Sequence, residues 1–168
     1  FVKPRFGGSS LASQYCESKE ELDTLIQKNT SVEFLKEEPI TGREFTVGVI
    51  DYKEGTVALP VVEIIPKGTF FDFDSKYDQE KLGTEICPAH IPSELSEELK
   101  QQALNIHNHL RAKHLSRSDF IVTDDNDVYF LEINTIPGLT ETSLIPKMLE
   151  VQNISLEELF KYWVENIS

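Results

Sequence analysis

The amino-acid sequence predicts an α+β fold with a largely antiparallel sheet flanked by helices. Two observations support this prediction. Short runs rich in β-branched and aromatic residues are joined by brief connections, which is typical of antiparallel sheets. Other stretches place apolar residues at helical spacing. The chain has 168 residues, of which 39% are hydrophobic, so it is long enough for one or two small cores.

Composition and charge exclude several classes of function. The formal net charge is -13, which argues against nucleic acid and the membrane surface as partners. No apolar run approaches the roughly 18 residues that span a bilayer, and no signal-peptide pattern opens the chain. Cys16 and Cys87 match no metal or redox spacing, so reduced thiols in a cytoplasmic protein are expected. The start at Phe1–Pro4 resembles a strand already under way, and we therefore expect a fragment of a longer protein.

The first elements are a strand and a capped helix. Phe1–Pro4 predicts a short strand, and Gly7–Ser10 follows it as a glycine-serine loop. Such a loop can cradle phosphate through its backbone N–H groups, but it is also an ordinary flexible turn. Ser18 begins a capping box, and the helix it opens is expected to stop near Asn29.

An antiparallel meander is expected next. Its strands are predicted at residues 31–36, 44–51 and 56–65, with a break at residues 37–42. Pro60 indicates a bulge or a sheet edge.

Residues 66–92 are the least regular part of the chain and mix aromatic with charged side chains. A long irregular segment of this kind is usually either disordered or functional. The aromatic side chains among the charges favour a lid that closes over a ligand. The main helix is predicted over residues 93–115, and a last helix, capped by Ser155, over residues 155–167. The histidines of the main helix (His107, His109 and His114) are expected on its polar or boundary face, since their spacing matches no metal site.

A hairpin near the carboxyl end carries the strongest chemical signal. Strands are predicted at residues 119–123 and 129–134, joined by a turn at residues 124–127. If a simple hairpin folds about Asp125 and Asn126, Asp119 lies opposite Glu132, and Arg117 lies opposite Asn134. Side chains two residues apart share a face of a strand, so all four belong to one face.

Two facing carboxylates destabilise a hairpin unless a positive charge neutralises them. Carboxylate and amide oxygens suit Mg²⁺, so Asp119, Glu132 and Asn134 are candidate metal ligands. The alternative is a solvated sheet face with shared protons or exposed charges. The strand leaves the sheet through Pro137 and Gly138, where glycine allows a ligand to approach the backbone, and this favours an active site.

The order of several short motifs resembles one enzyme family. The motifs are Val2-Lys3-Pro4 with Gly8-Ser9-Ser10, Gly42-Arg43-Glu44-Phe45-Thr46-Val47, Ser75-Lys76-Tyr77, Arg117-Ser118-Asp119, and Leu131-Glu132-Ile133-Asn134-Thr135 followed by Pro137-Gly138. Together they resemble the carboxyl-terminal, nucleotide-binding part of the D-alanine–D-alanine ligases of the ATP-grasp superfamily. The resemblance covers the whole chain, whereas the amino-terminal part of such enzymes is absent from it.

The resemblance implies an ATP- and Mg²⁺-dependent ligation (Mn²⁺ serving in place of Mg²⁺) in which one D-alanine carboxylate becomes an acyl phosphate and the amine of a second D-alanine displaces phosphate. The product serves peptidoglycan synthesis. The nucleotide-binding roles that it implies are phosphate contacts from Lys3, Ser9, Ser10 and Lys76, an adenine site of Glu37, Glu38, Ile40 and Phe70, and ribose binding by Glu44.

For the chemical steps, the resemblance implies two Mg²⁺ ions on Asp119, Glu132 and Asn134. It also implies that Arg117 and the Gly138 N–H group stabilise an oxyanion. Ser143 and Leu144 would bind the carboxylate of the second substrate. Lys76 and Tyr77 on the lid favour an amine acceptor over a hydroxyl. Expected partners are D-alanine, the missing amino-terminal part and a second copy in a homodimer. The rival interpretations are another ATP-grasp carboxylate–amine ligase and a nucleotide-binding remnant without catalysis. The chain alone is expected to be inactive, because the first D-alanine site lies outside it.

Overall fold

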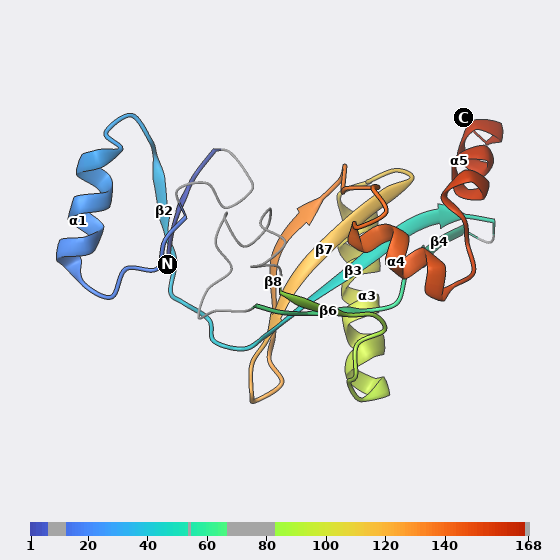
Figure 1. Ribbon diagram of the computed structural model, residues 1–168, viewed down its shortest axis with the longest axis horizontal. Coiled ribbons are helices and arrows are strands. Elements are labelled where there is room, and N and C mark those ends of the chain that lie inside the picture. Colours follow the sequence, from blue (N-terminus) through green and yellow to red (C-terminus); the bar gives the residue numbers. More distant parts are fainter. Residues whose placement is uncertain (7–12, 54, 67–82, 167–168) are drawn as a thin grey trace. The chain divides into compact units, whose positions relative to one another are not determined.

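The computed structural model describes residues 1–6, 13–53, 55–66 and 83–166. The chain divides into two compact units (Figure 1). The first comprises Phe1–Ile40 with Pro66–Thr84, and the second comprises Thr41–Ile65 with Glu85–Ser168. Among the described residues, no helix is both long and apolar enough to cross a membrane.

The first unit contains a two-stranded sheet and one helix. Strands β1 (Val2–Pro4) and β2 (Phe34–Lys36) pair in antiparallel fashion. Helix α1 (Lys19–Lys28) begins as the capping box predicts, because the Ser18 hydroxyl accepts a hydrogen bond from the Glu21 N–H group. No residue of α1 is buried, so the described part of this unit has little core.

The second unit is built on a six-stranded sheet. Its strands are β3 (Arg43–Tyr52), β4 (Gly55–Ala58), β5 (Val62–Ile65), β6 (Thr84–Ile86), β7 (Leu115–Val122) and β8 (Val128–Asn134). The order is β6-β5-β3-β7-β8. Strand β4 pairs with the last residues of β3, and β5 pairs with its first residues. The pairs that β3 makes with β4, β5 and β7, and that β7 makes with β8, are all antiparallel, so the expected fold class is confirmed. Residues 59–61 separate β4 from β5 and include Pro60. A break at this position is expected, because proline has no N–H group to donate within a sheet.

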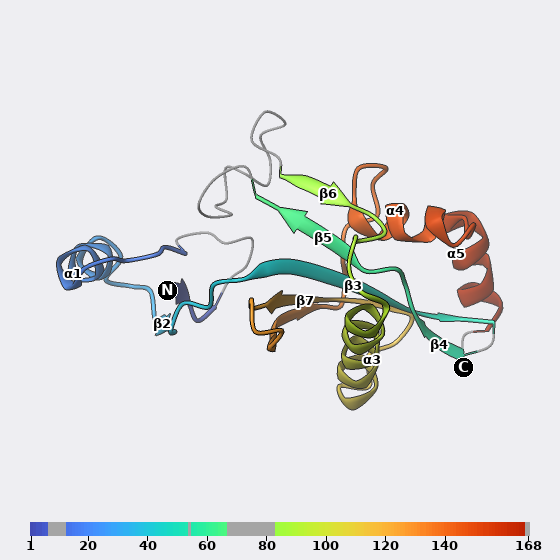
Figure 2. The same cartoon turned by 90° about the horizontal axis from the view of Figure 1, so that it is seen from below.

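Three helices cover the two faces of this sheet (Figure 2). Helix α3 (Ser93–His109) packs Leu99 and Ala103 against Phe45 and Val47 of β3 on one face. Helices α4 (Leu144–Val151) and α5 (Leu156–Glu165) lie on the other face, where Ile145 packs with Ile50 and other buried side chains. Odd-numbered positions of β3 therefore point toward α3, and even-numbered positions point toward α4 and α5.

Two sequence predictions are wrong at the level of elements, and one helix was not predicted at all. The strand predicted at residues 31–36 is only β2, and it pairs with β1 instead of continuing the meander. The helix predicted over residues 93–115 ends at His109, because Arg111 and His114 adopt positive φ angles and Leu115 already begins β7. Helix α4 was not predicted, although Ser143 precedes it as N-cap residue and its apolar residues Ile145, Met148 and Leu149 recur at helical spacing.

The predicted hairpin pairing is confirmed at the positions that matter. Arg117 lies opposite Asn134, and Asp119 lies opposite Glu132. The route differs from a simple hairpin, however. Val122 pairs with Val128, and in the turn between them Asn126 has a φ angle of 66°. A register shift between Asp119 and Phe120 then brings Asp119 opposite Glu132, as predicted. The turn and the β-bulge compensate each other.

Candidate active site

Arg117 and Asp119 form a bidentate ion pair on the face of β7 that α4 also covers in part. Arg117 Nε lies 2.9 Å from Asp119 Oδ1, and Nη2 lies 2.8 Å from Oδ2. Both side chains are 19% exposed, so the pair is largely withdrawn from solvent. Burial by itself lowers the pKa of Arg117, but the hydrogen bonds and charge of Asp119, with the charges of Glu132 and Glu85, raise this pKa above its ordinary value.

Glu132 and Asn134 complete this face from β8. Glu132 is exposed and lies directly opposite Asp119, and Asn134 Oδ1 accepts a hydrogen bond from the Ile136 N–H group at 3.0 Å. That bond leaves a further lone pair on the amide oxygen. The donor set of two carboxylates and one amide oxygen is chemically suited to Mg²⁺ or Mn²⁺. Within the described ranges, no cluster of three or more His, Cys, Asp or Glu side chains is placed to hold a metal ion, so any metal here depends on the Asn134 amide or on a bound ligand.

The start of α4 is tied to the turn that follows β8. The Ser143 hydroxyl lies 2.8 Å from Thr140 Oγ1 and accepts a hydrogen bond from the Thr140 N–H group. A Cβ atom at Gly138 would lie 2.8 Å from that hydroxyl, so glycine permits the close approach. Leu144 is half-buried and begins the helix. Gly138, predicted to stabilise the oxyanion, and the predicted substrate-binding residues Ser143 and Leu144 therefore lie close together where the chain enters α4.

Gly48 connects this turn to the ion pair. It lies opposite Arg117 in the β3–β7 register. A Cβ atom at Gly48 would come within 2.7 Å of Ile145 Cδ1 in the first turn of α4. The beginning of α4 therefore packs on the same sheet face next to the position of Arg117, where a helix N-terminus favours negative charge.

Two of the nucleotide-binding residues predicted in the first unit form an ion pair with each other: Lys3 of β1 and Glu37, which directly follows β2. Lys3 Nζ lies 2.8 Å from Glu37 Oε1, and the Glu37 N–H group donates to the Phe1 carbonyl at 2.8 Å. The amide N–H group of Glu37 is thus already paired. Glu38 is exposed and Ile40 is half-buried. Glu44 lies in the second unit on β3, where it pairs with Ile121 and Ile64.

Several predicted site residues lie outside the described part of the chain. They are Ser9, Ser10, Phe70, Lys76 and Tyr77, together with most of the predicted lid at residues 66–92.

Two buried polar side chains differ from the sequence predictions: Thr46 of β3 was not singled out, and His107 of α3 was placed wrongly. Thr46, which lies opposite Asp119, is fully buried, and its hydroxyl lies 2.5 Å from Asp119 Oδ1. His107 was placed on a polar or boundary face, but it is 1% exposed and contacts Ser116 Oγ at 2.7 Å. A threonine in a strand is an ordinary strand former, so only the register identifies its partner.

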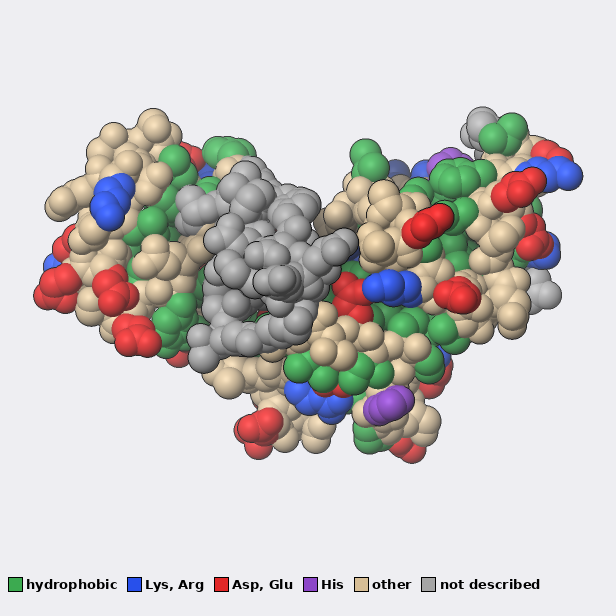
Figure 3. All heavy atoms as spheres, viewed as in Figure 1, with side chains coloured by type: hydrophobic (Ala, Val, Ile, Leu, Met, Phe, Trp, Pro, Cys, Tyr) green, Lys and Arg blue, Asp and Glu red, His purple; other side chains and the backbone are tan. Residues whose placement is uncertain are grey.

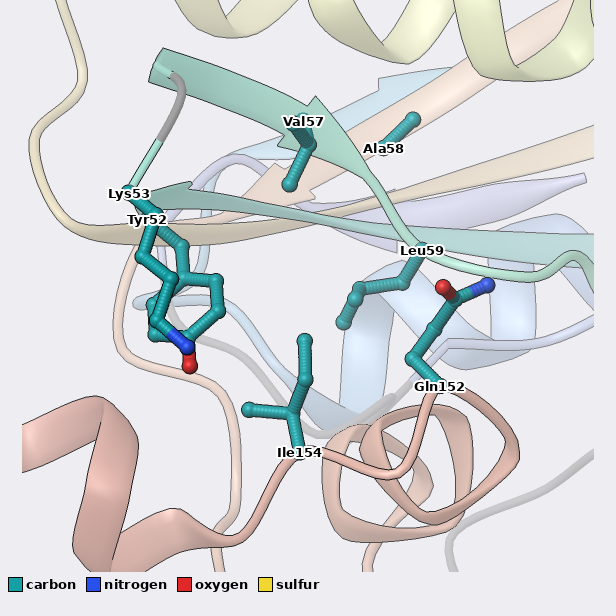
Figure 4. A pocket seen from close by; sticks show the side chains of 7 residues that line it. All are labelled: Tyr52, Lys53, Val57, Ala58, Leu59, Gln152 and Ile154. Carbon is teal, nitrogen blue, oxygen red and sulfur yellow. The ribbon is translucent and has the colours of Figure 1, made fainter.

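A surface hollow of about 290 Å³ lies near the far end of β3 (Figure 4). Its lining residues are Tyr52, Lys53, Val57, Ala58, Leu59, Gln152 and Ile154. None of them is a predicted site residue, and the Lys53 ammonium is already paired with Glu158 at 2.7 Å. We interpret the hollow as a groove between the β3–β4 hairpin and the turn that joins α4 to α5.

Acidic side chains are scattered over the face drawn in Figure 3, with isolated basic ones among them. This distribution agrees with the net charge of -13 and offers no continuous basic surface on the part of that face which the structure describes.

The sequence matches the family model described as D-ala D-ala ligase C-terminus over residues 1–165. It is 41% identical over 167 residues to a D-alanine--D-alanine ligase of Flavobacterium johnsoniae, covering 98% of this chain and 51% of that enzyme. A D-alanine--D-alanine ligase of Fervidobacterium nodosum is 41% identical over 161 residues, which cover 94% of this chain and 50% of that enzyme.

Solved structures of similar fold give the same picture. The VanG D-Ala:D-Ser ligase from Enterococcus faecalis superimposes with a TM-score of 0.83 at 29% identity, covering 98% of this chain and 48% of that one. The D-alanine--D-alanine ligase from Bacillus anthracis complexed with ATP superimposes with a TM-score of 0.76 at 27% identity, covering 98% of this chain and 50% of that one. The chain thus spans about half the length of these relatives. By its sequence and its fold, the chain belongs to the D-Ala-D-Ala ligase family and corresponds to the carboxyl-terminal part of its members.

Proposed function

We propose that this chain is the carboxyl-terminal part of a cytoplasmic ATP- and Mg²⁺-dependent D-alanine–D-alanine ligase that makes D-alanyl-D-alanine for peptidoglycan. The observation that carries the proposal is the β7–β8 register, which puts Arg117, Asp119, Glu132 and Asn134 on one face in a family with an ATP-complexed member. The proposed protein includes an amino-terminal half of the kind its relatives have, and it acts as a homodimer.

In this proposal Asp119, Glu132 and Asn134 would hold the divalent metal. When bound, the metal would supply charge neutralisation at the phosphates, which is the main requirement of phosphoryl transfer. Lys3 would add a positive charge at the phosphates, and the Glu44 carboxylate would accept hydrogen bonds from ribose hydroxyls. Glu37, Glu38, Ile40 and Phe70 would hold adenine, with Ser9, Ser10 and Lys76 around the phosphates.

The chain's own residues would also position the acyl group and the acceptor. Arg117 carries five N–H donors, so it can stabilise an oxyanion together with the Gly138 N–H group. The ion pair with Asp119 uses the Nε–H group and one Nη2–H group, so three N–H donors remain for the oxyanion. At the start of α4, the Ser143 hydroxyl and the Leu144 N–H group would bind the acceptor's carboxylate, because the Ser143 N–H group already donates to the Thr140 carbonyl.

The first test is nucleotide binding by the full-length protein. Glu132→Gln keeps the side chain's shape but removes its charge, so it should abolish most of the Mg²⁺-dependent ATP affinity in isothermal titration. Glu165→Gln, which changes an exposed residue of α5, should leave that affinity unchanged and serves as the matched control. An unaltered affinity in Glu132→Gln would refute the proposed metal site.

The acceptor needs a separate test, because the similarity to a D-Ala:D-Ser ligase supports D-serine as a second candidate. Phosphate release by the full-length protein should be measured with D-alanine alone and with D-alanine plus D-serine, D-lactate or an L-amino acid. We expect turnover with D-alanine alone and the smallest stimulation by D-lactate. Release only with an L-amino acid would identify a different carboxylate–amine ligase, and ATP binding without release would identify a remnant without catalysis.

A further inference from the structure

Asp119 accepts hydrogen bonds from two side chains, a long one that is partly exposed and a short one that is fully buried. Its Oδ1 atom accepts hydrogen bonds from the Thr46 hydroxyl at 2.5 Å and from Arg117 Nε at 2.9 Å, and its Oδ2 atom accepts one from Arg117 Nη2 at 2.8 Å. Arg117 has a long side chain that is 19% exposed and can turn toward a ligand. Thr46 is fully buried and has no such freedom.

The position of Thr46 in the sheet makes it rigid. It lies in the middle of β3, paired on one side with Val62 of β5 and on the other with Asp119 of β7. A β-branched side chain on such a strand has few rotamers available to it. The alternative acceptor for its proton, the Ser118 carbonyl, is farther away at 3.3 Å. The shorter contact therefore takes the single hydroxyl proton.

We infer that Thr46 is a positioning residue that holds the Asp119 carboxylate in its metal-binding orientation when Arg117 turns away. The inference rests on the proposed function, because it takes Asp119 to be a metal ligand. With Arg117 gone, Oδ2 and one lone pair of Oδ1 become available, while the Thr46 hydroxyl keeps Oδ1 in place. Hydrogen bonds of this kind to metal ligands fix their orientation, and their loss typically weakens metal binding about 10–100-fold.

The test is to titrate this chain with Mn²⁺ alone and to count the free ion by electron paramagnetic resonance. Thr46→Val keeps the shape of the side chain and removes the hydroxyl, and Thr46→Ala removes it without crowding the core. Both should raise the Mn²⁺ dissociation constant about 10–100-fold. Thr46→Ser retains the donor and should stay within about threefold of the parent chain, which a role limited to core packing would not produce.

Thr56→Val is the matched control, since the Thr56 hydroxyl donates to Asp51 Oδ1 at 2.7 Å in the same kind of pair elsewhere on the sheet. It should leave the Mn²⁺ affinity unchanged. Asp119→Asn separates the two hypotheses. If Asp119→Asn weakens Mn²⁺ binding and the two hydroxyl-free Thr46 variants do not, the inference is wrong and the metal site stands. If Asp119→Asn itself has no effect, or the parent chain takes up no Mn²⁺, the proposed metal site fails and the inference fails with it.

Discussion

His107 is a titratable side chain in the interior of the second unit. It projects from α3, contacts Ser116 Oγ of β7, and its Nε2 atom lies 3.9 Å from Asp51 Oδ1 of β3. Burial lowers the pKa of this histidine from its ordinary value of 6.5, while the nearby Asp51 charge partly opposes the shift. The neutral imidazole therefore belongs to the folded state.

We predict that the chain loses stability as the pH falls below 6.5. In that range the unfolded histidine binds a proton more readily than the folded one, so the free energy of unfolding rises with pH until the unfolded histidine is neutral. Urea unfolding between pH 8 and 5, followed by the fluorescence of the single tryptophan, Trp163, measures this slope. Hydrogen bonds lower the pKa values of Asp51 and Glu158 from their ordinary values of 3.8 and 4.5. These two carboxylates therefore change the free energy of unfolding at a lower pH than His107 does.

His107→Gln should flatten the slope between pH 5 and 7, whatever it does to absolute stability. His109→Gln is the matched control, because His109 is exposed on the same helix two residues away. Equal slopes in the parent chain and in His107→Gln would show that another group is responsible.

How far single residues could be predicted from the sequence depended on the range of the interaction. Asp119 and Glu132 could be paired by counting along one hairpin, since their contact is local. The partnership of Thr46 with Asp119 spans 73 residues, and nothing in the local pattern indicates which strands become neighbours. The burial of His107 has the same origin, because Ser116 and Asp51 reach it from two different strands.

At the scale of elements, the chain's local signals predicted helix starts better than helix ends. Ser18 and Ser155 cap α1 and α5 as expected, with their hydroxyls accepting from Glu21 and Glu158 N–H groups. The end of α3 is set instead by the positive φ angles of Arg111 and His114, for which the sequence contains no glycine signal. The sheet that receives β2 is likewise a matter of tertiary pairing, which a strand's own residues do not specify.

The packing of α4 on β3 leads to a prediction for Gly48. A Cβ atom there would lie 2.7 Å from Ile145 Cδ1, 2.9 Å from Leu59 Cδ1 and 3.0 Å from Met148 Sδ. Gly48→Ala should therefore lower the free energy of unfolding by about 1–3 kcal/mol, as overpacking of a core does. Urea unfolding measures the change.

Ile145→Val supplies the control, since it removes the Cδ1 methyl group that the new Cβ atom would meet. Alone it should cost about 0.5–1.5 kcal/mol. Combined with Gly48→Ala it should cost less than the sum of the two single changes, because the two sites share one contact. If the two changes in the free energy of unfolding simply add, the strain caused by Gly48→Ala does not arise from contact with Ile145 Cδ1.

At the scale of the whole molecule, the two units differ in how much they bury. Of the described residues in the first unit, Val2 is the one hydrophobic side chain among the buried core, whereas both large apolar clusters belong to the second. Burial of apolar surface is the main favourable term in folding. The second unit should therefore fold cooperatively, and the described part of the first should open far more readily.

Amide hydrogen exchange followed by mass spectrometry tests this difference. Peptides from β3, β7 and α3 should exchange slowly, at rates that reflect global unfolding, and peptides from α1 should exchange faster by orders of magnitude. If α1 were as protected as α3, its stability would have to come from contacts that the described residues do not make.

The bond between Arg117 and Asp119 has a consequence for ion exchange. Arg117 is a cation attached to the same strand as the carboxylate it neutralises, two residues away. Its effective concentration at Asp119 is thus fixed by the chain and does not fall on dilution, as that of a dissolved ion would. In the proposed metal site, a dissolved cation would therefore compete with a tethered one for the Asp119 carboxylate. If the cation displaced Arg117, the exchange would also free one guanidinium, which could then bind an anion.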